Sequence, residues 1–235
     1  MNPSSGIVLA VTLGILPGII AQRKGRCFID WWLYGMALFA VALVHSLLLQ
    51  PARTRCIYKG VFLIATGRSE GLEYFGDSSA RFLASLASLA LWPAIGLAAI
   101  AAGSGRPEMA ADVMASVCAI VAPPVITYEL ATRWDRAARW ARYATGFNWC
   151  QWALPVAGII LITIVGELSR NGLPRDAAVA LLVCAFSAYG LWLHWFIAWR
   201  GLVISRVRAA LLVVLVNAVS VMLVVLPHLL TGVHA

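Results

Sequence analysis

Long apolar runs separated by short polar segments dominate this chain. A helix needs about 20 consecutive, mostly apolar residues to cross the hydrocarbon core of a bilayer. Seven runs approach that length: 6–21, 31–49, 82–102, 109–130, 148–165, 177–199 and 209–230. The pattern therefore predicts an all-α, polytopic transmembrane helical bundle with six or seven membrane segments.

Composition supports a membrane protein. Hydrophobic residues make up 62% of the chain and charged residues 12%, whereas a soluble domain is usually about 45–50% apolar and about 25% charged. The first run is short and contains Pro17-Gly18, and four later runs contain proline. Because proline frees backbone carbonyls that lipid does not satisfy, we expect the segments to pack as one bundle.

The net charge of +8 comes from basic residues that lie in the short segments between apolar runs. This placement favours contact with lipid headgroups and argues against nucleic acid as a partner. With seven crossings, twelve basic residues share one side: Arg53, Arg55, Lys59, Arg68, Arg81, Arg133, Arg136, Arg139, Arg142, Arg200, Arg206 and Arg208. The positive-inside rule assigns them to the cytoplasm and the C-terminus to the periplasm. Many arginines and alanines are typical of a GC-rich bacterial genome, so we expect the bacterial inner membrane.

The turn at residues 22–30 conflicts with seven crossings. It carries Arg23, Lys24 and Arg26, yet seven crossings place it outside, together with Arg106, Arg170 and Arg175. Two alternatives follow. Either the first two segments cross fully and the charge rule is overridden there, or they form a re-entrant or interfacial hairpin.

Three regions are expected along the chain: a two-segment hairpin over 1–52, an interfacial linker over 53–81, and a five-span helical block over 82–235. The block should include a cytoplasmic amphipathic helix near 128–145. There, four arginines recur at helical spacing on one arc, and Trp134 lies with alanines on the opposite arc. The arginines are Arg133, Arg136, Arg139 and Arg142. Such a helix lies on the membrane surface or docks an acidic partner or headgroup.

The hairpin carries Pro-Gly-Ile-Ile-Ala-Gln-Arg-Lys-Gly-Arg at 17–26, Trp-Trp-Leu-Tyr-Gly at 31–35, and a late His45. This arrangement resembles the small bacterial superinfection-immunity-type membrane proteins. The resemblance implies membrane placement and a partner-binding role, without catalytic residues. Residues 143–152 look like part of an uncharacterised alphaproteobacterial membrane family, and the layout of the five-span block is similar to that of the Yip family.

The sequence contains few groups able to carry chemistry. Nucleophile, phosphate-loop and zinc-protease motifs are missing, and none of the five cysteines forms a Cys-x-x-Cys pair. We therefore expect no catalytic residue, no metal site, no disulfide scaffold and no resident cofactor. His45 and His194 leave one alternative open, since two imidazoles on different helices can hold a b-type haem.

Polar groups inside the apolar runs are the usual markers of transport, and here they are few, with Asn217 and Thr163 as examples. The hypothesis that follows is a non-enzymatic accessory, scaffolding or assembly subunit of an inner-membrane complex. Its partners would be membrane lipids and other integral membrane subunits. A small-molecule or ion transporter or channel, and a haem- or quinone-binding redox subunit, are the alternatives.

Overall fold

The computed structural model describes residues 3–50, 56–103 and 109–231. All secondary-structure elements assigned within these ranges are helices, which confirms the all-α prediction. The chain divides into two compact units, Met1–Lys59 and Gly60–Ala235. Each unit is described by itself below.

Unit 1 contains three helices: α1 (Pro3–Arg23), α2 (Phe28–Ala37) and α3 (Phe39–Leu48). Helix α1 packs against both α2 and α3. The backbones of α1 and α2 approach closely where two glycines meet, because a Cβ atom on Gly35 would lie 2.9 Å from the Cα atom of Gly14. The indole of Trp32 also donates a hydrogen bond to the Val11 carbonyl at 3.0 Å.

The second apolar run was expected as one continuous segment, and that expectation is wrong. The run breaks at Leu38, whose backbone leaves the helical region at φ −141° and ψ 62°. Helices α2 and α3 contain 10 residues each. At about 1.5 Å per residue each rises about 15 Å, which is half the thickness of the hydrocarbon core.

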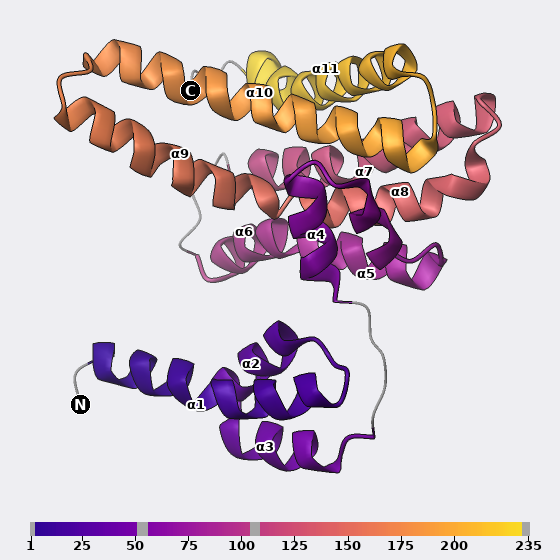
Figure 1. Cartoon of the computed structure of the whole chain (residues 1–235). Coiled ribbons are helices and arrows are strands. Elements are labelled where there is room, and N and C mark those ends of the chain that lie inside the picture. Colours follow the sequence, from indigo (N-terminus) through magenta and orange to yellow (C-terminus); the bar gives the residue numbers. More distant parts are fainter. Residues whose placement is uncertain (1–2, 51–55, 104–108, 232–235) are drawn as a thin grey trace. The chain divides into compact units, whose positions relative to one another are not determined.

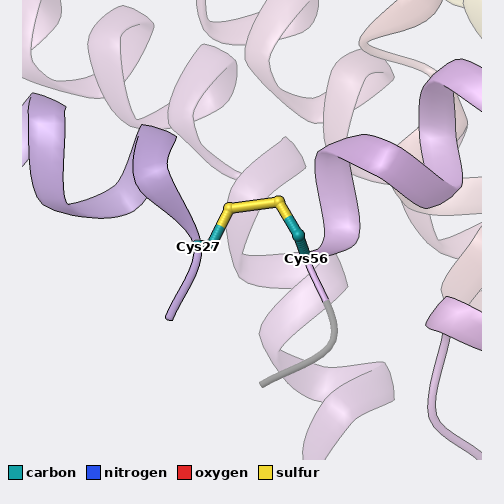
Figure 2. The surroundings of a disulfide bond; sticks show 2 residues. All are labelled: Cys27 and Cys56. Atoms are coloured by element: carbon teal, nitrogen blue, oxygen red, sulfur yellow. A yellow bond between two sulfur atoms is a disulfide. The ribbon is translucent and has the colours of Figure 1, made fainter. Parts of the chain in front are cut away.

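Unit 1 closes on itself at one end. Cys27 and Cys56 form a disulfide (Figure 2), with their Cα atoms 5.1 Å apart. The sequence had given no support for a disulfide. Their 29-residue separation gives no local signal. The Lys24 ammonium donates to the backbone carbonyls of Ser46 and Leu47. The two ends of the segment between Cys27 and Cys56 therefore lie together.

The remaining elements follow in chain order (Figure 1): α4 (Ile57–Ala65), the short 3₁₀ helix η1 (Ser69–Tyr74), α5 (Ser79–Leu89), α6 (Leu91–Ala101), α7 (Met109–Arg133), α8 (Ala137–Cys150), α9 (Ala153–Arg170), α10 (Arg175–Leu202) and α11 (Arg206–Thr231). Helix α8 packs against α5, α7 and α10, and α11 packs against α7 and α10. Residues 143–148 of α8 are all buried. This helix is thus the centre of the second unit.

Four stretches are long and apolar enough to cross a membrane: Asp112–Arg133, Ala137–Arg170, Arg175–Leu202 and Arg206–Leu223. Helices α5 and α6 make a fifth if the pair, bent by 51°, is one span. Pro93 lies in the first turn of α6, where its missing N–H costs no helical hydrogen bond. The protein is therefore membrane-embedded. The predicted six or seven membrane segments would also require the shorter apolar helices, Val11–Arg23 and Phe39–Leu48, to enter the membrane.

The single amphipathic helix expected near 128–145 is also wrong, because the chain turns between α7 and α8. Asp135 adopts a left-handed conformation with φ 56°. The Arg136 N–H reaches the Ala131 carbonyl at 2.7 Å, and the Asp135 N–H reaches the Thr132 carbonyl. This is the Schellman pattern that ends helices, here with Asp in place of the usual Gly.

Close packing of α1 on α2 gives a test of unit 1. We expect Gly35→Ala to lower the free energy of unfolding by about 1–3 kcal/mol, because the new methyl group would overlap the Gly14 backbone. Chemical unfolding of the detergent-solubilised protein measures the change. Gly166→Ala in α9 is the matched control, since a Cβ there meets nothing within 4 Å. Equal effects of the two substitutions would contradict the close approach.

Candidate functional site

Arginine and tryptophan side chains gather where α7, α8, α10 and α11 begin or end. We call this region the arginine–tryptophan end and define it by Trp134, Arg136, Trp195, Trp199, Arg200, Arg206 and Arg208. Its residues come from the turn between α7 and α8, the last two turns of α10, and the first turn of α11. Two turns whose contacting residues, Arg136 and Val203, are 67 residues apart in sequence thus form one surface.

Trp199 is the centre of this cluster. The Arg200 guanidinium lies 3.9 Å from the centroid of its ring, and the Arg206 guanidinium lies 4.8 Å from it. Trp195 stacks on Trp199 with 5.2 Å between ring centroids and donates its indole N–H to the Arg206 carbonyl at 3.0 Å. Both arginine side chains are exposed, and cation–π contacts hold their guanidinium groups near the Trp199 ring.

The second part of the cluster joins the two turns. Arg136 Nε donates to the Val203 carbonyl at 3.3 Å, and the Arg208 guanidinium lies 5.9 Å from the Trp134 ring. Val203 itself adopts a left-handed conformation with φ 52°, which is costly for a β-branched residue. The contact from Arg136 fixes the turn that carries this strain.

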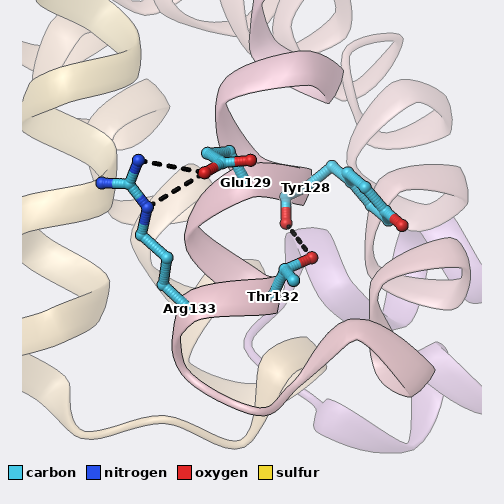
Figure 3. Close-up of polar contacts among 4 residues, drawn as sticks. All are labelled: Tyr128, Glu129, Thr132 and Arg133. Atoms are coloured by element: carbon cyan, nitrogen blue, oxygen red, sulfur yellow. Dashed lines mark hydrogen bonds and ion pairs between the residues drawn. The ribbon is translucent and has the colours of Figure 1, made fainter.

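The structure separates the four arginines that were predicted to share one helical arc. Arg133 ends α7 and pairs with Glu129 at 3.0 Å (Figure 3), while Arg142 in α8 pairs with Asp77 at 3.0 Å. Arg136 precedes α8, and Arg139 is exposed on it. Only Arg136 and Trp134 of the predicted set belong to the arginine–tryptophan end. Nor does α8 lie on the surface, since its second half is buried.

Buried polar side chains form hydrogen bonds between helices of the same unit. Asn148 Nδ2 donates to Ser85 Oγ at 3.0 Å, and both side chains are buried. Ser85 Oγ in turn donates to the Phe82 carbonyl at 2.6 Å. The Trp140 indole donates to the buried Thr127 hydroxyl at 3.1 Å. These bonds join α8 to α5 and to α7, and sequence reasoning missed them.

The two histidines proposed as haem ligands lie in different units. His45 of α3 packs against the rings of Trp31 and Tyr34 in unit 1. His194 of α10 lies 4.8 Å from the Phe147 ring and 3.2 Å from the Gln151 amide nitrogen. Its Nδ1 atom is buried without a hydrogen-bond partner among the described residues. Pairing of the two histidines on one haem stays a prediction.

Other titratable and polar groups serve local structure. In unit 1 the Tyr58 hydroxyl donates a hydrogen bond to Asp30. Partial burial raises the pKa of the Asp30 carboxyl, and this hydrogen bond lowers it by a smaller amount. Thr163 and Asn217 donate to carbonyls of their own helices, at Ile159 and Val213. Within the described part of the chain, no group of three or more His, Cys, Asp or Glu side chains is placed to hold a metal ion.

Comparisons with known proteins gave no match. No family model, no curated protein and no solved structure matches it. The resemblances of residues 17–49 and 143–152 therefore stay predictions.

The buried bond between Asn148 and Ser85 gives a second test. A double-mutant cycle of Asn148→Leu and Ser85→Ala should show a coupling energy of about 0.6–1.7 kcal/mol, which are the average and the maximum for hydrogen bonds between membrane helices. Unfolding of the four proteins in detergent measures it. Thr163→Val combined with Ser85→Ala is the control and should be additive, because Thr163 bonds only its own helix. Additivity in the first cycle would show that the bond contributes nothing.

Proposed function

We propose that the chain is a non-enzymatic accessory, scaffolding or assembly subunit of a bacterial inner-membrane complex. The observation that carries this proposal is an exposed face of small residues on α10. The members of this small-residue face recur every three or four residues, as one side of a helix requires: Ala177, Ala180, Cys184, Ser187 and Ala188.

The opposite side of α10 already has partners within the chain. Ala178, Leu193 and Ile197 are buried there, and a Cβ atom added to Gly158 of α9 would lie 3.4 Å from the Phe186 ring. Figure 1 shows α9 and α10 running side by side toward the turn that connects them. The small-residue face therefore points away from α9.

Small residues are the usual contact surface between membrane helices, because they let two backbones approach closely. Larger side chains on other sides of α10, such as Val179 and Val183, are 54% and 57% exposed and suit lipid chains. If lipid alone covers such a face, the close contacts between two helix backbones are not made. We therefore assign it to a helix of another integral membrane subunit.

Other candidate functions have less support. Transport would use a water-lined path reaching Thr163 or Asn217, yet both side chains bond their own helices. A redox role rests on His45 and His194. The resemblance of the N-terminal hairpin to superinfection-immunity-type proteins agrees with a partner-binding role.

Charge placement supports a particular topology. If Cys27 and Cys56 lie on one side of the membrane, the chain between them makes no net crossing, and α2 and α3 form a re-entrant hairpin. Arg23, Lys24 and Arg26 then join the twelve basic residues already assigned to the cytoplasm. Only Arg106, Arg170 and Arg175 of the 18 basic residues remain outside. The positive-inside rule therefore favours six crossings with a periplasmic C-terminus.

The partner proposal is tested by enlarging the small-residue face. We expect Ala180→Leu with Ala188→Leu to remove stoichiometric partners from protein purified in gentle detergent from its native membrane, because the added side chains block close helix packing. Val179→Leu with Val183→Leu, on other exposed sides of α10, is the matched control and should retain them. A wild-type protein that purifies alone would contradict the proposal. A haem spectrum lost on replacing His45 or His194 would favour the redox alternative.

The topology is tested by labelling single cysteines with a membrane-impermeant maleimide in intact cells. In a variant without the native cysteines, we expect Gln22→Cys and Glu70→Cys to be protected and Ser169→Cys to be labelled. All three positions are exposed in the structure, and permeabilised cells give the control for reactivity. Labelling of Gln22→Cys without Glu70→Cys would instead support full crossing by the second run.

A further inference from the structure

Two helices begin at the arginine–tryptophan end with the wrong charge for a helix N-terminus. The N-terminus of a helix carries a partial positive charge and is stabilised by acidic residues. Helix α8 has no acidic residue in its first turn and is preceded by Arg136. Helix α11 also has none and starts with Arg206 and Arg208. Positive side chains and positive helix ends thus converge at one surface.

The two turns contain one carboxylate among the described residues, that of Asp135 beside Arg136, and it forms no ion pair with these arginines. The ion pairs nearby engage Arg133 and Arg142. Within the part of the chain that the structure describes, none joins Arg136, Arg200, Arg206 or Arg208 to an acidic side chain. These four arginines instead contact backbone carbonyls and indole rings. Four guanidinium groups therefore remain available to an anion.

Apolar groups in the same turn indicate what kind of anion fits. Val203 is 49% exposed and Val207 is 70% exposed, between and beside the arginines. Half-buried Trp134 and Trp199 belong to the same surface. Tryptophan prefers the boundary between headgroups and hydrocarbon, where its ring is in an apolar setting and its N–H near water. A ligand with both a phosphate and acyl chains matches this mixture of charged and apolar groups.

We propose that the arginine–tryptophan end binds the phosphodiester headgroup of an anionic phospholipid. Arg206 and Arg208, with Arg136 and Arg200, supply the N–H groups that bind phosphate oxygens, since planar guanidinium groups suit bidentate contacts. Trp199 holds Arg200 and Arg206 in place by stacking. The valines and tryptophans contact the first carbons of the acyl chains.

The test is a lipid titration of the full-length protein in a neutral detergent, followed by the thermal midpoint. Phosphatidylglycerol should raise the midpoint, whereas phosphatidylcholine should not. Arg206→Gln with Arg208→Gln should weaken the apparent affinity for phosphatidylglycerol about thirtyfold, since two basic contacts to an anionic lipid are lost. Both side chains are exposed, and the bond from Trp195 uses the Arg206 backbone, so the fold should persist.

Two further variants make the result specific. Arg170→Gln with Arg175→Gln removes the same charge at the turn between α9 and α10 and should leave the affinity unchanged. Arg206→Lys with Arg208→Lys keeps the charge and should recover part of it. An equal loss in the Arg170 and Arg175 variant would overturn the proposal as a non-specific charge effect. Equal stabilisation by inorganic phosphate or by an acidic peptide would also overturn it, because neither has acyl chains.

Discussion

Polar groups that leave water have to find partners inside the chain, and the structure of the second unit depends on this constraint. In hydrocarbon an unsatisfied polar group costs several kcal/mol. Asn148 is therefore matched to Ser85, and Ser85 to a backbone carbonyl. The bond from Asn148 fixes the rotation of α8 relative to α5, because a rotated α8 would leave this polar side chain without a partner. Apolar contacts alone are less directional.

The same constraint acts where helices end. Gly25, Gly67, Asp135 and Gly172 all have positive φ values and follow helices. At Gly25, for example, the next N–H returns to the Ala21 carbonyl at 3.0 Å. The chain thus reverses while the last carbonyls of the helix keep hydrogen bonds. Three of these four positions are glycine and follow the ordinary sequence rule, and Asp135 does not.

This difference explains which parts of the fold were predictable. Apolar runs at 109–130, 177–199 and 209–230 became long helices because periodicity and length carry that information locally. Pro123-Pro124 lies inside α7 without ending it, whereas the helix break at Leu38 has no proline or glycine beside it. Contacts made by α1 with both α2 and α3 accompany that break. Tertiary packing decided both cases, and a single sequence does not display it.

The candidate site was predictable only in part, for a similar reason. Counting charges drew attention to the arginines of residues 133–142, but helical periodicity could not show that Asp135 would end α7. It also could not show that Arg136 would contact Val203, 67 residues later in the chain. One available signal was missed: Arg206 and Arg208 stand where acidic residues usually begin a helix. Ser85 and Asn148 gave a weaker signal, as polar residues near the starts of two predicted apolar runs.

Closure of unit 1 does not depend on the oxidation state of Cys27 and Cys56. Cytosolic thiols of mesophiles are usually reduced, so a cytoplasmic position would oppose a permanent disulfide. Lys24 still binds the carbonyls at the end of α3, and Tyr58 still binds Asp30. These contacts bring residues on both sides of the α2–α3 segment together without the sulfur–sulfur bond. The proposed return of this segment to the side where it began therefore does not require the disulfide.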